Sequence, residues 1–435
     1  MTKSQKQKSN IIRESVFLWY SNPKHKKECD RLYDVARSEK IIDIYEKTTE
    51  RSEINRLFVK TDLLILTANK YERNMLHSLS YSETNEKIKE IDLTLNTASK
   101  LFNQVSAYSF SLCGYTVLNI HSRVTGAYTN GGAADVIRYM LSSEYLFPAA
   151  VISFGICFGT KERRASLGDV VLSKKVYPYF IGAKVKGEQL AVTDDNMFSI
   201  QGDLAKALED LEGKNQLNKS ALGFDVVFGN YITGEAVVSS AKYRERYEKI
   251  TTQPIDAGDM EAYGVFKECN TPPYSIPCIV MKAICDWAIE KNYDVSDRDV
   301  IADYCKIVLN CNVDELTEKR HNEIVETIGT LMDRLQAYAA GNSFTVLKTL
   351  LKSCLFGHSA YYMIKGVVTE KTKEKDFQKE TWSGYDLEDI IKEIHNKCHY
   401  PVHQEYINTI ATALVSEGIA SDFQTTNIGF TFSIG

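Results

Sequence analysis

Acidic residues stand directly after segments that the sequence marks as buried strands. Asp259 and Glu261 flank Met260 in the stretch IDAGDMEAYGVF, Asp286 ends the apolar run CIVMKAICD, and Glu72 follows LLILTA. An acid can simply begin a helix, because the helix N-terminus carries partial positive charge. In open α/β sheets, however, ligands collect beyond the carboxyl ends of the strands. Glu72, Glu261 and Asp286 are therefore predicted to meet in one pocket, where carboxylates can exchange protons with a substrate.

The elements that must position these acids alternate between strand and helix patterns. Near-continuous Val, Ile and Leu runs are typical of strands covered on both faces, and amphipathic segments between them are typical of covering helices. The predicted strands are residues 62–68, 115–122, 149–157, 168–177, 224–232 and 276–286. This order predicts an α/β fold with a central mixed sheet flanked by helices. Gly155 and Gly159, after one of these strands, would permit close approach of a ligand to the backbone.

Three units are predicted along the chain: residues 1–58, 59–341 and 342–435. The first is expected to be a helical extension, because residues 11–58 are polar, helix-forming and free of glycine. The second is the α/β domain, which ends in a helix closed by Gly341. That helix is indicated by the spacing of Ile324, Ile328, Leu331, Leu335 and Tyr338.

The last unit is expected to be a small α+β domain. Helices are predicted at residues 345–355, 385–396 and 403–417, followed by a terminal hairpin. Three helices and a hairpin follow in the order of a winged helix, although other small α+β domains match this order equally well. The predicted recognition helix has no Lys or Arg, so this domain is expected to bind protein rather than DNA.

Composition narrows the class of protein. The chain has 435 residues and a net charge of −5, which gives no reason to expect a nucleic-acid or membrane partner. No apolar stretch is long enough to span a bilayer, and the N-terminus lacks the apolar core of a signal peptide, so a cytoplasmic location is expected. Ten cysteines occur without a CxxC pair and are expected to be reduced.

Residues from about 61 to 338 resemble the nucleoside phosphorylase superfamily, and within it the methylthioadenosine/S-adenosylhomocysteine nucleosidases. The resemblance rests on the ordered motifs LILTANKYE, VISFGICFG, LGDVVLS, YITGEAVV, DAGDMEAYGV and VMKAICDWA. It implies that Asp286 donates a proton toward purine N7 and that Glu261 grips the ribose hydroxyls, with Met260 under the sugar. It also implies that Glu72 activates water and that Val237 and Val238 line the purine pocket.

This assignment agrees with the chemistry of a purine N-glycosidic bond. In the transition state, positive charge builds on the ribose and negative charge on the base. An acid at N7 lets the base leave as a neutral species, and a nearby carboxylate stabilises the cationic sugar. A protonated Asp286 would need its pKa raised by burial or by neighbouring groups. We therefore expect hydrolysis of a purine nucleoside or nucleotide, with no cofactor and no metal.

Two alternatives remain open. Phosphorolysis would need cations for phosphate, and Arg123, Lys161, Arg163 and Arg164 are candidates, but none lies in a phosphorylase motif. A non-catalytic nucleotide sensor or scaffold would keep the fold without the chemistry. The complete set of acids favours catalysis over that alternative.

The loop GTKERRAS, which contains Lys161, Arg163 and Arg164, could bind a 5′-phosphate chain if it faces the pocket. The alternative is a solvated loop. Family members with added domains occur in bacterial defence systems that destroy purine nucleotides, and the terminal extensions fit that context. The resemblance further implies a homo-oligomer.

One departure from the family affects the prediction of the base-binding site. The chain has TGEAV where the family usually has an aromatic ring, so Val237 removes that ring and Tyr263 is one candidate to replace it. His395, Cys398, His399 and His403 are potential zinc ligands, but Pro401 breaks the helix that would align them, so surface or packing roles are favoured.

Overall fold

The computed structural model describes most of the chain. The described residues are 3–38, 43–93, 105–122, 124–160, 165–179, 184–186, 189–191, 197–235, 253–272, 274–288, 293–371, 373, 380–383, 386–389, 404–426 and 429–434. Within these ranges, every helix is too short or too polar to cross a lipid bilayer.

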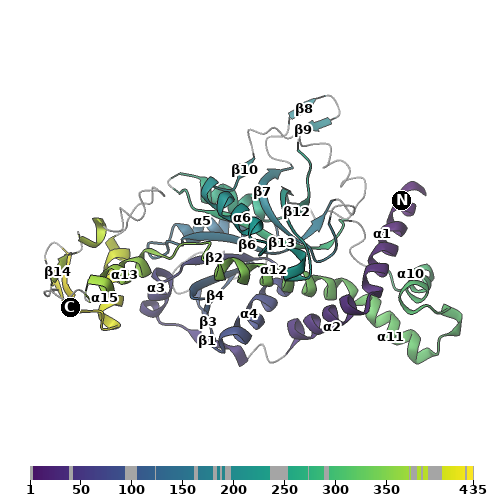
Figure 1. The fold of residues 1–435 in the computed structure, drawn as a ribbon, viewed down its shortest axis with the longest axis horizontal. Coiled ribbons are helices and arrows are strands. Elements are labelled where there is room, and N and C mark those ends of the chain that lie inside the picture. The colour runs from purple at the N-terminus through teal and green to yellow at the C-terminus, as the bar shows by residue number, and fades with distance from the viewer. Residues whose placement is uncertain are drawn as a thin grey trace.

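An eleven-stranded mixed sheet forms the centre of the molecule, as the sequence predicts (Figure 1). Its strands are β1 (Tyr45–Thr48), β2 (Leu63–Thr67), β3 (Ile88–Ile91), β4 (Val105–Leu112), β5 (Tyr115–Ser122), β6 (Ala150–Gly159), β7 (Val170–Pro178), β10 (Phe198–Ser199), β11 (Val226–Thr233), β12 (Ala257–Asp259) and β13 (Cys278–Asp286). All six predicted strands are present. A separate pair, β8 (Lys184–Lys186) and β9 (Gln189–Ala191), is antiparallel.

Part of this sheet closes on itself, which the sequence did not indicate. Strand β6 pairs with β12 and with β13. Strand β13 pairs directly with β7, and β12 pairs with β11, which also pairs with β7. The strands β6, β12, β11, β7 and β13 therefore form a closed ring. Because β2, β6 and β13 run parallel, their carboxyl ends lie at one edge. Strand β12 runs antiparallel to β6, so the chain along β12 runs in the direction opposite to β6.

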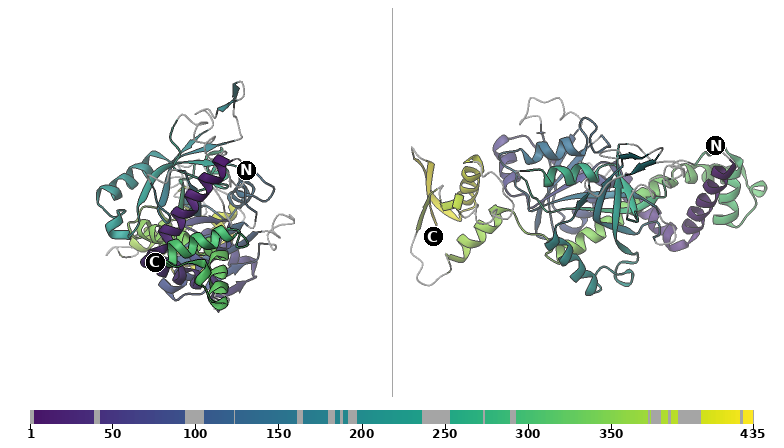
Figure 2. Two further views of the ribbon diagram at one scale, coloured as in Figure 1. Left: turned by 90° about the vertical axis from the view of Figure 1, so that its right-hand side faces the viewer. Right: turned by 90° about the horizontal axis from the view of Figure 1, so that it is seen from above.

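Helices cover the sheet and extend beyond it. They are α1 (Lys3–Ser21), α2 (Pro23–Arg37), α3 (Arg51–Val59), α4 (Lys70–Thr84), α5 (Ala133–Leu141), α6 (Gly202–Gly213), α7 (Lys219–Leu222), α9 (Ala262–Asn270), α10 (Arg298–Tyr304), α11 (Glu318–Gly329), α12 (Leu331–Lys352), α13 (Ala360–Lys371) and α15 (Gln404–Ser416), with a π-helix at Cys305–Leu309 and a 3₁₀ turn at Val313–Glu315. The molecule is elongated: α1, α10 and α11 lie at one end and the C-terminal unit at the other (Figures 1 and 2).

Strand β13 shows how the core is built on both of its faces. All nine of its residues are buried. Val280 and Ile284 belong to the core that contains α9, whereas Ile279, Met281 and Ala283 pack with the core that contains the second half of α12. Side chains alternate along a strand, so a strand covered on both faces needs apolar residues at successive positions.

The predicted helical extension differs from the structure in one respect. Asn22 caps α2 and Pro23 is its first residue, which separates α1 from α2. Residues 45–48, however, form β1, which pairs in parallel with β3. The Tyr45 hydroxyl also hydrogen-bonds to His77 Nδ1 at 2.8 Å. Pairing with a distant strand therefore overrides the local helix preference, and the expectation of helix there is wrong.

The predicted helix end at Gly341 is also wrong. Helix α12 continues to Lys352 and includes most of the helix predicted at 345–355. A Cβ on Gly341 would lie 2.9 Å from Leu32 Cδ1 of α2. The glycine therefore allows two helices to approach closely rather than ending one of them. The division of the chain into three domains stays a prediction.

The C-terminal unit contains α13, α15 and a three-stranded antiparallel sheet in the order β14 (Glu380–Ser383), β16 (Gly429–Ile434), β15 (Ala420–Thr426). The helix ended by Gly418 and the terminal hairpin agree with the sequence prediction. Of the helix expected at 385–396, residues 386–389 are helical, and 390–396 lie outside the described residues.

A buried carboxylate joins this unit to the amino ends of the central strands. Asp62, just before β2, is fully buried. Its Oδ2 accepts a hydrogen bond from Thr116 N at 2.8 Å, and its Oδ1 accepts one from Ser359 N at 2.7 Å. Burial raises its pKa, although both N–H groups oppose that shift. Asp62 thus connects two strands of the sheet to the segment between α12 and α13.

We predict that Asp62→Ala lowers the free energy of unfolding by about 2–4 kcal/mol, because two buried N–H groups lose their acceptor. Chemical denaturation measures this change. Asp314→Ala is the control: Asp314 pairs with Arg298, both side chains are exposed, and such pairs contribute about 0–1 kcal/mol. Equal losses in the two variants would contradict a structural role for the Asp62 hydrogen bonds.

Candidate active site

Glu72, Met260, Glu261 and Asp286 lie in one pocket at the carboxyl edge of β2, β6 and β13. The pocket has a volume of about 270 Å³. The residues that line it are Ala68, Asn69, Glu72, Thr125, Ile156, Cys157, Phe158, Gly258, Asp259, Met260, Glu261, Cys285, Asp286 and Gln336. The structure therefore brings together acids that are separated by more than two hundred positions in the chain.

Glu72 both caps a helix and faces the pocket. It is the third residue of α4 and forms a capping box with Asn69. Its Oε2 accepts hydrogen bonds from Ala68 N at 2.8 Å and Asn69 N at 2.9 Å, while Oε1 accepts one from Ile156 N at 2.9 Å. These N–H groups hold the carboxylate in one orientation against β6.

The environment of Glu72 raises its pKa to about 7. Burial is the main cause, the charge of Lys282 opposes it, and the charge of Glu261 adds to it. A carboxyl group with this pKa exchanges a proton readily near neutral pH, whereas an ordinary glutamate is fully ionised there. Glu72 thus has the acid–base property that a general base requires.

Lys282 is the residue that the sequence analysis missed. It lies in the middle of β13, and its Nζ is 2.7 Å from both Asp259 Oδ2 and Glu261 Oε2. Burial acts to lower its pKa, but the charges of Asp259, Glu261 and Glu72 outweigh burial, so the pKa lies well above its ordinary value. The available signal was a lysine inside the apolar run CIVMKAICD, because a buried charge needs a charged partner.

Asp259 and Glu261 have different roles at the start of α9. Asp259 accepts hydrogen bonds from Ala262 N at 3.2 and 3.1 Å, so it caps the helix. Glu261 occupies the N-cap position but makes no capping hydrogen bond with its side chain. Its carboxylate instead bonds to Lys282 and lines the pocket. The acid that caps the helix and the acid available to a ligand are therefore distinct.

Asp286 ends β13 at the level of Phe158 on β6. Its Oδ1 accepts a hydrogen bond from Ala288 N at 2.7 Å. Ala288 has a φ of 57°, a left-handed conformation that non-glycine residues rarely adopt. This turn places an N–H group where it orients the Asp286 carboxyl group.

The two predicted ligand-contacting glycines instead make space for protein side chains. A Cβ on Gly155 would lie 2.0 Å from Glu72 Oε1, and one on Gly159 would lie 2.5 Å from Trp287 Cζ3. Neither glycine is among the residues that line the pocket. Gly155 therefore acts on the site through the position of Glu72.

Several predicted residues lie outside the described part of the chain. These are Val237 and Val238, the basic residues Arg123, Lys161, Arg163 and Arg164, and the group His395, Cys398, His399 and His403. Within the described ranges, no cluster of three or more His, Cys, Asp or Glu side chains could hold a metal ion. None of the nine cysteines in these ranges forms a disulfide bond.

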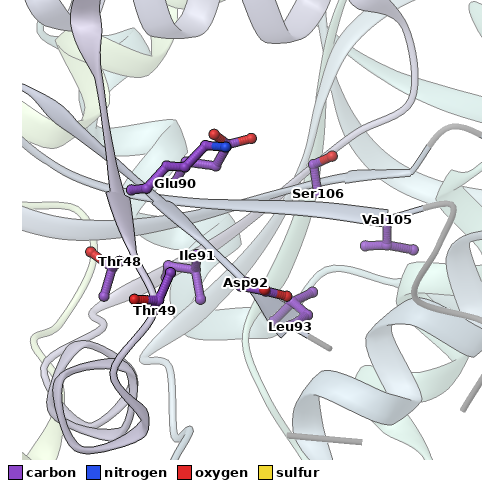
Figure 3. A pocket seen from close by; sticks show the side chains of 9 residues that line it. Thr48, Thr49, Glu90, Ile91, Asp92, Leu93, Val105 and Ser106 are labelled. Atoms are coloured by element: carbon purple, nitrogen blue, oxygen red, sulfur yellow. The ribbon is translucent and has the colours of Figure 1, made fainter. Parts of the chain in front are cut away.

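A second pocket of about 280 Å³ lies farther along the sheet edge, where β1 and β3 end and β4 begins. Figure 3 shows Glu90, Asp92 and Ser106 around it, and Lys47, the neighbour of Glu90 in the β1–β3 pair, also lines it. It contains none of the three predicted acids. The acids thus identify the pocket between β2, β6 and β13 as the candidate active site.

We predict that Gly155→Ala destabilises the protein and displaces Glu72. Gly155 has a φ of 142°, and strain of this kind costs about 1–3 kcal/mol in addition to the clash with Glu72. Unfolding measurements test this prediction. Gly213→Ala, at the end of α6 with no atom within 4 Å of the added carbon, should leave stability unchanged or slightly increased. Wild-type stability of Gly155→Ala would show that the backbone tolerates the change.

Parts of this chain are similar to known proteins. The model of the phosphorylase superfamily matches residues 122–311. A protein of Amphimedon queenslandica named "Death domain-containing ATP nucleosidase" is 26% identical over 169 residues, which are 35% of this chain. The match spans about a third of that protein's length, 31%.

Solved structures are similar over most of this chain. The Neisseria meningitidis 5′-methylthioadenosine/S-adenosylhomocysteine nucleosidase is 19% identical, with a TM-score of 0.45, and covers 68% of this chain and 99% of its own. The Helicobacter pylori futalosine hydrolase is 12% identical, with a TM-score of 0.45, and covers 67% of this chain and 97% of its own. The segment that the phosphorylase superfamily model matches, residues 122–311, contains Glu261, Lys282 and Asp286.

Proposed function

We propose that this protein is an N-glycosidase that hydrolyses the bond between a purine and the ribose of a nucleoside or nucleotide. The main support is the arrangement of Glu72, Glu261 and Asp286 in one pocket, with Lys282 paired to Glu261. The match of the phosphorylase superfamily model to residues 122–311 and the similarity to a protein named as an ATP nucleosidase add support.

Each acid has a separate task in this reaction. Asp286, oriented by Ala288 N, delivers a proton to purine N7 so that the base leaves neutral. Glu261 accepts hydrogen bonds from the ribose hydroxyls and stabilises the positive charge that develops on the sugar. Glu72 accepts a proton from the attacking water, and its pKa of about 7 suits that role.

We propose hydrolysis rather than phosphorolysis because Glu72, with a pKa of about 7, can accept a proton from water. No arginine or lysine occurs among the described residues that line the pocket. Phosphate recognition usually relies on such cations and on backbone N–H groups. Lys282 is not among the residues that line the pocket, and its ammonium group pairs with Asp259 and Glu261.

The substrate's 5′ group and the biological setting form a second part of the proposal. We retain Lys161, Arg163 and Arg164 as candidate ligands for a 5′-phosphate chain, with the name of the Amphimedon queenslandica relative as support. We also propose a role in antiviral defence. The terminal extensions fit this role, because the resemblance described above includes proteins with added domains in defence systems. A cytoplasmic location agrees with the free cysteines.

Assembly into a homo-oligomer is likewise proposed. In the described part of the chain, Ile11 and Leu18 on α1 and Met363 and Val367 on α13 are large apolar side chains exposed to solvent. Exposed apolar groups on the same helix face are typical of protein–protein contacts. Light scattering at micromolar concentration would test this proposal.

We predict that Asp286→Asn abolishes release of purine base while the fold is retained. The amide keeps the oxygen that accepts from Ala288 N but has no proton to deliver to N7, and losing a general acid lowers rates by about two to four orders of magnitude. Chromatography of adenosine, methylthioadenosine, S-adenosylhomocysteine, AMP and ATP incubations, with and without phosphate, measures the product.

Asp314→Asn, on the exposed surface, is the matched control. Wild-type turnover in a folded Asp286→Asn protein would remove Asp286 from the mechanism. Strong acceleration by phosphate would identify a phosphorylase, and the absence of base release from every substrate would favour a binding protein.

The pH dependence should follow the ionisation of Glu72. A general base must be a carboxylate, so the acid side of the kcat/KM profile should fall tenfold per pH unit below about 7. Glu72→Gln should remove this limb and slow the reaction. Rates that stay constant from pH 8 to pH 5 would contradict the assignment of Glu72 as the base.

A further inference from the structure

We propose that Phe158 is the aromatic residue on which the purine base stacks. This inference rests on the proposed function and names the residue that recognises the base. Phe158 follows VISFGIC in the sequence. The sequence analysis assigned it no binding role.

Phe158 has the right position for this role. It lines the pocket together with Gly258 and Asp286. Phe158 is the register partner of Asp286 on the neighbouring strand, so the two residues are neighbours that both line the pocket. A base with its N7 edge toward Asp286 therefore has Phe158 within reach of its face.

The ring is also held in place before a ligand arrives. A Cβ on Gly258 would lie 2.1 Å from Phe158 Cζ, so the ring occupies the space that any other residue would fill. Phe158 packs in an aromatic and aliphatic cluster with Tyr177, Tyr179, Ile232, Ile255 and Ala288. A side chain fixed in this way loses little conformational freedom when a base binds.

The other aromatic residue considered from the sequence, Tyr263, packs elsewhere. Its ring centroid is 5.8 Å from Tyr128 and 5.2 Å from Phe198, and it does not line the pocket. Among the described lining residues, Phe158 is the one aromatic side chain. Base stacking on an aromatic ring is tolerant of base identity, because every base has a π-face.

The test measures binding of free adenine to the full-length protein by calorimetry, which does not depend on turnover. Phe158→Leu keeps apolar volume but removes the π-face, so its Kd should rise about 10- to 100-fold. Phe158→Tyr should bind within about threefold of wild type, since it keeps the ring. Gly258→Ala should also weaken binding, because its Cβ displaces the ring. Tyr263→Leu is the matched control and should bind adenine as wild type does.

The outcomes separate this inference from the proposed function. Wild-type affinity in folded Phe158→Leu and Gly258→Ala proteins would overturn the stacking role and leave the N-glycosidase proposal intact. Tighter binding in Phe158→Leu would show that the ring obstructs the pocket, which also overturns it. Failure of the wild type both to bind adenine and to release any base would overturn both proposals. Thermal unfolding of each variant confirms that it is folded.

Discussion

A buried lysine ammonium group lies between two carboxylates that line the pocket. Lys282 bonds to Asp259 and Glu261, and each of the three side chains would be strongly destabilising if it were buried alone. Their pairing fixes the end of β12, the start of α9 and the middle of β13 relative to one another. The position of Glu261, and with it the geometry offered to a sugar, depends on this buried ion pair.

The same charges determine the acid–base character of the site. Lys282 favours the ionised form of Glu72, whereas burial and the charge of Glu261 favour its protonated form. Burial prevails, and the pKa lies near neutrality instead of near 4.5. Glu72 can therefore exchange a proton near neutral pH beside the Lys282–Glu261 pair.

The backbone around the pocket is shaped to serve its side chains. Gly155 leaves space for the Glu72 carboxylate, Gly258 leaves space for the Phe158 ring, and the left-handed turn at Ala288 presents an N–H group to Asp286. Gly155 and Gly258 lie on the neighbouring strands β6 and β12, and Ala288 follows β13. The long helix α12 also contributes, since Gln336 lines the pocket and hydrogen-bonds to Asn69 at 3.1 Å.

The sequence by itself determined the six main strands, the α/β class and the placement of Glu72, Glu261 and Asp286 after strands. Buried strands and helices can be predicted in this way because they need apolar residues at characteristic spacings along the chain. The local spacing of apolar residues does not indicate which distant segments come into contact. The tertiary structure alone decided that β1 joins the sheet, that Gly341 lies within a helix against Leu32, and that Asp259 rather than Glu261 caps α9. It also paired Lys282 with two acids and placed Phe158 beside Asp286, since both arrangements depend on which strands become neighbours.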